Sequence, residues 1–432
     1  MPLHRMRSLL AAALAIVTLA ASSSVLPQPL LDLSSGNAEL EIVDRLAQIE
    51  AQHGPRSSEL IAPLRTLALL YQERGENALA AAAVDRAWEL VRINHGVQSL
   101  DQADLIRQRI EIANGHGDLM EAWNLEQALL VLARRHSDDA RTVGILHRIA
   151  DERMSVLERY VDGEFPPQIV LGCYYAGAGD DTIPAASDSR FGECTQGFRG
   201  VAIRSILWEA QMLYSDAIKA AIANDLYSSD ELRELEMKLV RSSFLYGAMY
   251  EDGRDYLLGR ESLRRLAAYD AAVSAPLLAQ IEALIRIADW DILFSRSRNL
   301  QDAALATYEL AYRRLMRSGE NEAAIEAAIA DLFSPETPVV LPTFLPNPFA
   351  SADAKPSGEY VDIAFEVTRE GKGRNVDIRG GSAETTRAVA RHVNQLIRRS
   401  RFRPRLVDGR FADSPILLRY YLPAELAVRE DS

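Results

Sequence analysis

A helical period runs through most of this 432-residue chain and restricts it to folds built from packed helices. Leu60, Leu64, Leu67 and Tyr71 recur at intervals of four, three and four residues. This spacing places them on one face of a helix. The pattern breaks at Gly75, and further helical stretches follow. Helices of this length, joined by short turns, indicate stacked hairpins rather than one compact bundle.

The first hairpin combines small residues, which let two helices approach closely, with larger residues that fill the space between them. These positions are Leu67, Ala68, Tyr71, Gly75, Ala80, Val84 and Ala87. Their spacing resembles the tetratricopeptide repeat. The shift that carries Gly75 onto Gly117 also carries Ala80 onto Ala122, so we expect degenerate repeats over residues 37–160 and 201–333. The resemblance implies an α-helical solenoid that binds protein or peptide segments.

In residues 358–423 the helical period gives way to alternation. Tyr360–Thr368 alternates apolar and polar residues and predicts a strand, and a glycine-containing turn leads to a second strand at Asn375–Arg379. A helix is expected from about Glu384 to Arg399, because its apolar residues fall on one face. A last strand is predicted at Ile416–Tyr421. The pattern predicts a small α+β domain with the order strand, strand, helix, strand.

This domain resembles the C-terminal domain of the TonB energy transducer family. The resemblance rests on the element order, on the run Arg401-Phe402-Arg403-Pro404 after the helix, and on the turn Asp408-Gly409. It implies a ββαβ fold whose final strand lies at a sheet edge, where an extended segment of an outer-membrane receptor or another envelope protein adds as a further strand. The candidate edge residues are Ile416, Leu417, Leu418, Arg419, Tyr420 and Tyr421. The alternative is that they form a closed, paired strand.

Charge is distributed unevenly along the chain. The formal net charge is −13, which argues against a nucleic-acid partner. Residues 359–423 nevertheless carry 13 basic and 8 acidic side chains. A local basic cluster consists of Arg398, Arg399, Arg401, Arg403 and Arg405. We expect this cluster either to attract acidic partner segments or to balance an acidic part of the same chain.

The N-terminus has the pattern of an export signal. Arg5 and Arg7 precede an apolar run, Leu9–Ala20, and small residues follow. The run is shorter than the roughly 20 residues that cross a bilayer as a helix. We therefore expect residues 1–23 to be a cleaved signal peptide and the mature protein to reside in the periplasm, without a stable membrane span. The alternative is that the run is retained and anchors the protein in the inner membrane, facing the periplasm.

Residues 161–200 interrupt the helices with a stretch rich in Gly, Pro, Asp and Ser that holds the two cysteines, Cys173 and Cys194. In an exported chain we expect these two to form a disulfide. Closing a loop of about 20 residues stabilises a protein by roughly 3 kcal/mol in the chain-entropy model. The alternatives have no support in the sequence, since a redox pair lacks the Cys-x-x-Cys spacing and a metal site lacks a histidine between the cysteines.

Six of the chain's 18 prolines fall within residues 334–357. Such a segment is extended and semi-rigid, so we expect a linker between the helical array and the C-terminal domain. Its apolar residues would let it lie along the array. They are Val339, Val340, Leu341, Phe344, Leu345 and Phe349.

No pattern of catalytic residues stands out. The seven histidines are scattered, and the chain has no His-Glu-x-x-His, Gly-x-Ser-x-Gly, Walker or Rossmann motif. We expect no enzymatic activity, no cofactor and no metal site. The sequence predicts a periplasmic interaction adaptor in which tetratricopeptide-like repeats are joined to a TonB-like domain. Two alternatives remain open, a membrane-anchored TonB-type energy transducer for outer-membrane transport and a purely structural envelope scaffold.

Overall fold

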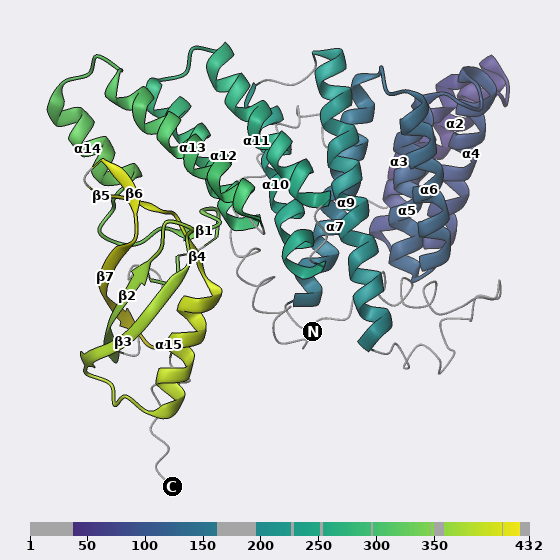
Figure 1. The fold of residues 1–432 in the computed structure, drawn as a ribbon. Helices are drawn as coiled ribbons and strands as arrows, with labels where there is room; N and C mark the ends of the chain where they lie inside the picture. Colours follow the sequence, from purple (N-terminus) through teal and green to yellow (C-terminus); the bar gives the residue numbers. More distant parts are fainter. Residues whose placement is uncertain are drawn as a thin grey trace, which may run out of the picture. The chain divides into compact units, whose positions relative to one another are not determined.

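The computed structural model describes residues 38–161, 196–225, 229–250, 254–294, 297–345, 347–349, 358–407 and 409–423. These residues fall into two compact units that divide between Leu235 and Glu236. Figure 1 labels their helices and strands. The predicted signal peptide, both cysteines (Cys173 and Cys194) and Asp408 of the predicted turn lie outside the described residues.

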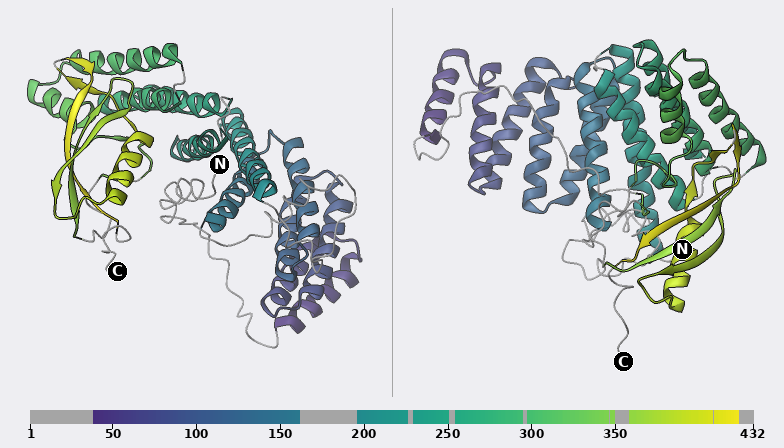
Figure 2. Two further views of the ribbon diagram at one scale, coloured as in Figure 1. Left: turned by 60° about the horizontal axis from the view of Figure 1, so that its bottom comes forward. Right: turned by 90° about the vertical axis from the view of Figure 1, so that its left-hand side faces the viewer.

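The first unit is built from helices that follow one another along the chain and stack side by side (Figure 2). From α2 to α7, successive helices form hairpins, because each long helix ends at a short turn and packs against the next one. The elements are α2 (Ala38–His53), η1 (Ser58–Leu60), α3 (Ile61–Glu73), α4 (Asn77–His95), η2 (Leu100–Gln102), α5 (Ala103–His116), α6 (Leu119–Arg135), α7 (Ala140–Val161) and α9 (Gln196–Asn224). A helical array is therefore confirmed.

The hairpin of α3 and α4 shows why the sequence folds in this way. The predicted contact residues are buried, with Ala68, Ala80 and Ala87 each 0% exposed. Their small side chains allow the two helices to pack closely, while Leu67 and Tyr71 join the same core. The glycine between the helices is needed for its backbone conformation, since Gly75 has a φ of +73°.

The turns of the first unit repeat at the interval that the sequence predicts. Gly117 has a φ of +82° and follows α5 as Gly75 follows α3. Ser57 and Ser99, which are related by the same interval, each accept a hydrogen bond from the backbone N–H two residues later, at 3.2 Å in both cases. Each serine thus begins the short 3-10 helix that leads into the next long helix.

A second repeated contact joins each hairpin to the turn that precedes it. Asn94 donates from Nδ2 to the carbonyl oxygen of Arg56 at 3.0 Å. His136 stands at the equivalent position of the next hairpin and contacts the carbonyl oxygen of Gln98 through Nε2 at 2.6 Å. Equivalent positions therefore satisfy equivalent turn carbonyls, although one is an amide and the other an imidazole.

The second unit continues with helices and ends in a small sheet domain. The helices are α10 (Ser229–Tyr250, which spans the division), α11 (Arg254–Ala272), α12 (Leu277–Phe294), α13 (Arg298–Met316) and α14 (Glu322–Leu332). The sheet domain contains β1 (Val340–Leu341), β2 (Tyr360–Val367), β3 (Gly373–Gly381), α15 (Arg387–Arg399), β4 (Arg401–Phe402), β5 (Arg405–Val407), β6 (Arg410–Ala412) and β7 (Ser414–Tyr421). A small α+β domain after the helices is therefore confirmed.

The central sheet has the strand order β3-β2-β7, with both pairs antiparallel. Val361, Ile363 and Phe365 of β2 are buried on the face that α15 covers. Val393 and Ile397 of α15 enter the same core. Figure 1 shows α15 beside this sheet. The two short pairs β1–β4 and β5–β6 were not predicted from the sequence.

The proline-rich segment that was expected to be a linker belongs to both cores of the second unit. Val340 and Leu341 pair with β4, and Leu341 packs among the helices. Phe349 lies in the core of the sheet domain. Phe344 packs edge-on against Phe244 of α10, with 5.6 Å between the ring centroids. The described part of the segment therefore packs on the helices, as its apolar residues predicted, and also enters the core of the sheet domain.

Candidate functional site

The predicted edge strand occupies the outer position of the sheet. β7 pairs with β2 through eight consecutive residue pairs, from Tyr360 opposite Tyr421 to Val367 opposite Ser414, without a register shift. Within the described part of the chain, no strand pairs with the other side of β7. Alternate backbone N–H and C=O groups on that side are therefore available to an added strand.

The opposite edge of the same sheet is irregular. The pairing of β3 with β2 contains two register shifts. Asn375 lies within β3 with a φ of 54°, and Gly381 has a φ of 150°. Bulges and left-handed residues twist an edge away from regular pairing, which discourages strand addition. Of the two edges, β7 is the one that presents a regular hydrogen-bonding template.

The side chains of β7 alternate between the two faces of the sheet. Ile416 and Tyr420 are buried towards α15, whereas Leu417 is 72% exposed. The guanidinium carbon of Arg419 lies 3.7 Å from the ring centroid of Tyr360, and Arg419 Nε donates to Asp362 Oδ1 at 3.0 Å. An added strand would therefore meet a mixed apolar and charged surface on the open face.

The backbone and core of β7 also fit an edge position. Pro415 has no backbone N–H, and proline within sheets is confined largely to edge strands, first residues and bulges. On the covered face, the Tyr420 hydroxyl lies 3.0 Å from His392 Nε2 on α15. Burial raises the pKa of Tyr420 to about 12, so this hydroxyl stays protonated at neutral pH.

The five arginines predicted as a partner-binding cluster do not form one surface. Arg403 is 11% exposed and forms a bidentate ion pair with Asp289 of α12, with N–O distances of 3.0 and 2.7 Å. It also donates to the carbonyl oxygen of Leu332 at 3.0 Å. Burial lowers the pKa of Arg403, but the attraction of Asp289 outweighs it and leaves the pKa above its ordinary value. This side chain holds the sheet domain on the helices.

The other members of the cluster differ in exposure. Arg405 donates to the carbonyl oxygen of Ser334 at 3.2 Å, and burial lowers its pKa. Arg401 is half-buried, and burial lowers its pKa as well. Arg398 and Arg399 are exposed at the end of α15, and Arg387 and Arg391 are exposed in the first half of the same helix. The sequence reasoning missed the last two, although their spacing of four residues along a predicted helix was a usable signal.

A close approach explains how the turn between β2 and β3 meets the helices. Gly371 has a φ of +71°. A Cβ atom there would lie 2.4 Å from the carbonyl oxygen of Phe402 and 2.7 Å from Cγ2 of Ile292 on α12. The turn therefore requires glycine both for its backbone angle and for the lack of space.

The first unit contains a groove of about 570 Å³ that the sequence did not predict. It runs across α3, α5 and α7, with residues of α6 in its lining and the short helix η2 at one end. Its lining residues are Arg65, Leu100, Asp101, Ala103, Asp104, Arg107, Ile110, Glu111, Asn114, Glu126, Leu129, Arg141, Gly144, Ile145, Arg148, Ile149 and Glu152.

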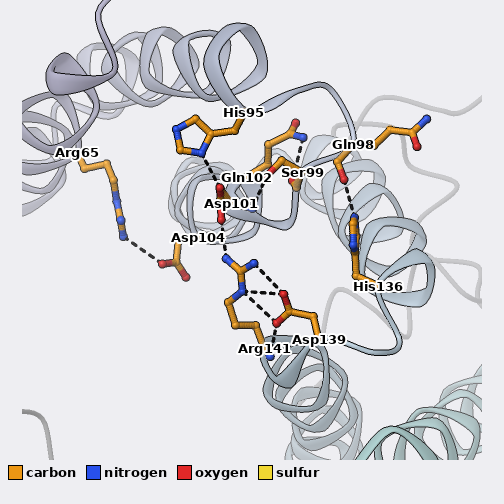
Figure 3. Close-up of polar contacts among 10 residues, drawn as sticks. All are labelled: Arg65, His95, Gln98, Ser99, Asp101, Gln102, Asp104, His136, Asp139 and Arg141. Atoms are coloured by element: carbon orange, nitrogen blue, oxygen red, sulfur yellow. Dashed lines mark hydrogen bonds and ion pairs between the residues drawn. The ribbon is translucent and has the colours of Figure 1, made fainter. Parts of the chain in front are cut away.

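A polar network fixes one end of this groove, and Figure 3 shows its members. Arg141 donates to Asp101 at 2.6 Å and to Asp139 at 2.8 Å. His95 Nδ1 lies 2.5 Å from the other oxygen of Asp101. The hydrogen bond from Arg141, followed by that from His95, lowers the pKa of Asp101 to about 2. The network joins the ends of α4 and η2 to the start of α7.

The middle of the groove combines an apolar floor with two charges. Ile110 and Ile145 are half-buried, and a Cβ added to Gly144 would meet no atom within 4 Å. Arg148 and Glu152 form no ion pair with each other or with other described residues. Glu152 is accessible to solvent, yet burial in the hollow raises its pKa against the opposing effect of Arg148. Such a surface suits an extended polypeptide with mixed side chains.

The described residues contain neither a candidate metal centre nor a candidate membrane span. No group of three or more His, Cys, Asp or Glu side chains among them is arranged to hold a metal ion. None of the described helices has the length and apolar character needed to cross a membrane. No protein-family model matches the chain, and no curated protein sequence matches it.

Proposed function

We propose that this protein is an interaction adaptor of the periplasm that binds extended segments of other proteins. The observation that carries the proposal is the regular outer edge of β7, which no described strand pairs with, in contrast to the irregular edge of β3 on the other side of the sheet. Addition of a strand to such an edge is an established mode of peptide recognition, because backbone hydrogen bonds hold the partner and alternate side chains select it. The resemblance of residues 358–423 to the TonB C-terminal domain supports the same mode.

The helical array provides a second surface for the same function. The groove across α3, α5 and α7 has room for several side chains of an extended segment. In the second unit, Pro342, Thr343 and Phe344 line a smaller cavity together with residues of α10 and α12. Helices of this chain thus already carry another segment of the chain on their surface, as a turn in which the Leu345 N–H donates to the carbonyl oxygen of Pro342 at 3.1 Å. This precedent and the tetratricopeptide-like pattern of the first hairpin support the assignment.

The full-length protein provides the test of strand addition. Random twelve-residue peptides would be selected for binding to it, and the best binders would be measured by fluorescence anisotropy. Amide hydrogen exchange along β7 would be followed with and without peptide. We expect bound peptide to slow the exchange of alternate β7 amides, because those amides face the open side.

Two proline variants sharpen this test. Leu417→Pro and Leu418→Pro remove amides that point to opposite sides of β7, since consecutive residues of a strand face opposite neighbours. One variant loses a bond to β2, and the other loses a donor for the partner. The variant that keeps the circular dichroism and melting temperature of the wild type should lose peptide binding. Slow exchange of every β7 amide without peptide, and no further change with it, would instead favour a structural scaffold.

A further inference from the structure

Helix α15 presents a basic surface that strand addition does not use. Its thirteen residues include four arginines and no acidic side chain. All four arginines are exposed, whereas Val389, Val393 and Ile397 are buried against the sheet. The helix therefore has one apolar face that belongs to the core and one cationic face that belongs to solvent.

Three of the arginines lie in a row. Arg387, Arg391 and Arg398 are separated by four and seven residues, which are close to whole numbers of helical turns. They project from the same side of α15 over a length of about 16 Å at 1.5 Å per residue. No member of α15 is among the exposed large hydrophobic residues of the described chain. The row is therefore purely polar.

The row arginines lack the ion pairs that several other arginines of the domain form. Arg374 pairs with Glu366 at 2.9 Å, and Arg419 pairs with Asp362 at 3.0 Å. None of the three row arginines forms an ion pair or hydrogen bond with any described residue. Like charges four residues apart destabilise a helix, so the row costs stability in the isolated domain. An acidic partner would remove that cost.

We propose that the row of Arg387, Arg391 and Arg398 is a docking surface for an acidic segment of a partner protein. Guanidinium groups bind carboxylates through paired hydrogen bonds, and three of them in line match carboxylates along an extended or helical segment. An anionic membrane is a poorer match. The apolar face of α15 is already buried in the sheet domain, and the chain as a whole carries a net charge of −13 that a broad anionic surface would repel.

The test uses full-length protein and a fluorescent twelve-residue peptide of alternating Glu and Ser. A peptide with Gln in place of Glu is the uncharged control. Loss of three exposed arginine–carboxylate pairs should weaken binding by roughly 3- to 100-fold in a triple variant, Arg387→Gln with Arg391→Gln and Arg398→Gln. Binding of the acidic peptide to the wild type should weaken as salt rises.

A matched variant separates the row from the total charge. Arg45→Gln, Arg92→Gln and Arg135→Gln change the net charge equally at three exposed positions of the first unit. We expect this variant to bind as the wild type does. Equal losses in both triple variants, or equal binding of the Gln peptide, would overturn the proposal. Row-dependent binding to vesicles with anionic lipid, without binding to the acidic peptide, would overturn it in favour of a lipid surface.

The two β7 proline variants keep this inference distinct from strand addition. If the row is a docking surface, acidic peptide should still depend on it in the variant that retains the fold but loses edge binding. If the acidic peptide slows the exchange of β7 amides and its affinity does not depend on the row arginines, the docking surface is refuted. Strand addition to β7 would still be supported.

Discussion

The two units of this protein differ in whether another part of the chain covers the surface of their helices. In the first unit a groove of about 570 Å³ lies open across α3, α5 and α7, and charged side chains line much of it. In the second unit Pro342, Thr343 and Phe344 of the chain itself lie over α10 and α12, and the cavity beside them is about 240 Å³. An apolar helix surface is stabilised by a covering segment, whereas a charged one remains solvated. In the second unit the helices thus bind a segment of their own chain, whereas in the first unit they leave a groove that suits a segment of another protein.

The largest expected effect comes from the anchor of the covered unit. Arg403→Ala leaves Asp289 buried without its cation, which should lower the free energy of unfolding by about 3–5 kcal/mol. Arg419→Ala breaks an exposed ion pair and should cost at most about 1 kcal/mol. Urea unfolding monitored by circular dichroism measures both. Similar losses in the two variants would contradict the assignment of Arg403 as the anchor.

Removal of the covering side chain should have the next largest effect. Phe344→Ala deletes a half-buried ring that packs on Phe244, so we expect a loss of about 2 kcal/mol, less than for a fully buried phenylalanine. Binding of a hydrophobic dye should rise as α10 and α12 become exposed. Thr343→Ala at the neighbouring exposed position is the control and should change neither property. If dye binding stays constant, the segment is not a cover.

The open groove can be filled without disturbing its walls. Gly144 lies within α7 and has free space at its Cβ position, so Gly144→Ala should stabilise the protein by about 0.5–1 kcal/mol. Gly144→Phe should block peptides that bind in the groove. Gly115, a helical glycine that also has free space but does not line the groove, gives the control variant Gly115→Phe. Equal binding to both phenylalanine variants would show that peptides bind elsewhere.

The smallest expected effect concerns the polar end of the groove. The folded pKa of Asp101 lies at about 2, below its ordinary value of 3.8, so its contribution to stability is present above pH 4 and is lost as the pH falls towards 2. The carboxylate is 38% exposed, so the difference between wild type and Asp101→Asn should stay below about 1 kcal/mol. Thermal unfolding at pH 5 and pH 2.5 checks that this difference shrinks on acidification. If the stability difference between wild type and variant is the same at both pH values, the ionised carboxylate of Asp101 is not the cause of that difference.

Local patterns in the sequence predicted the elements well, because burial on one face leaves a visible period. The first hairpin and the order of strands and helix in residues 360–421 follow from such periods. The position of Arg403 could not be predicted, since its partner Asp289 is 114 residues away and no local pattern connects them. The apolar residues of the proline-rich segment predicted that it lies along the helices, but not which helices it covers. Its prolines indicate an extended chain, but only the packed helices show what that chain covers.

The position of the groove could have been predicted in part from the sequence. Ser57 and Ser99 are separated by the same interval as Gly75 and Gly117, and this interval marks equivalent turns. Extending the alignment would have placed α3 and α5 side by side. The charged lining would still have been missed, because the pairing of Arg141 with Asp101 depends on a turn geometry that spacing alone does not give.

The unequal edges of the sheet also limit the size of any assembly. When a sheet has two regular edges, each copy that joins through one edge leaves its other edge open for the next copy. Addition of copies can then continue until a fibre forms. In this protein the second edge is β3, and the register shifts in its pairing make it a poor site for a further strand. A strand received by β7 therefore ends the series, and complexes should form with one partner strand per molecule.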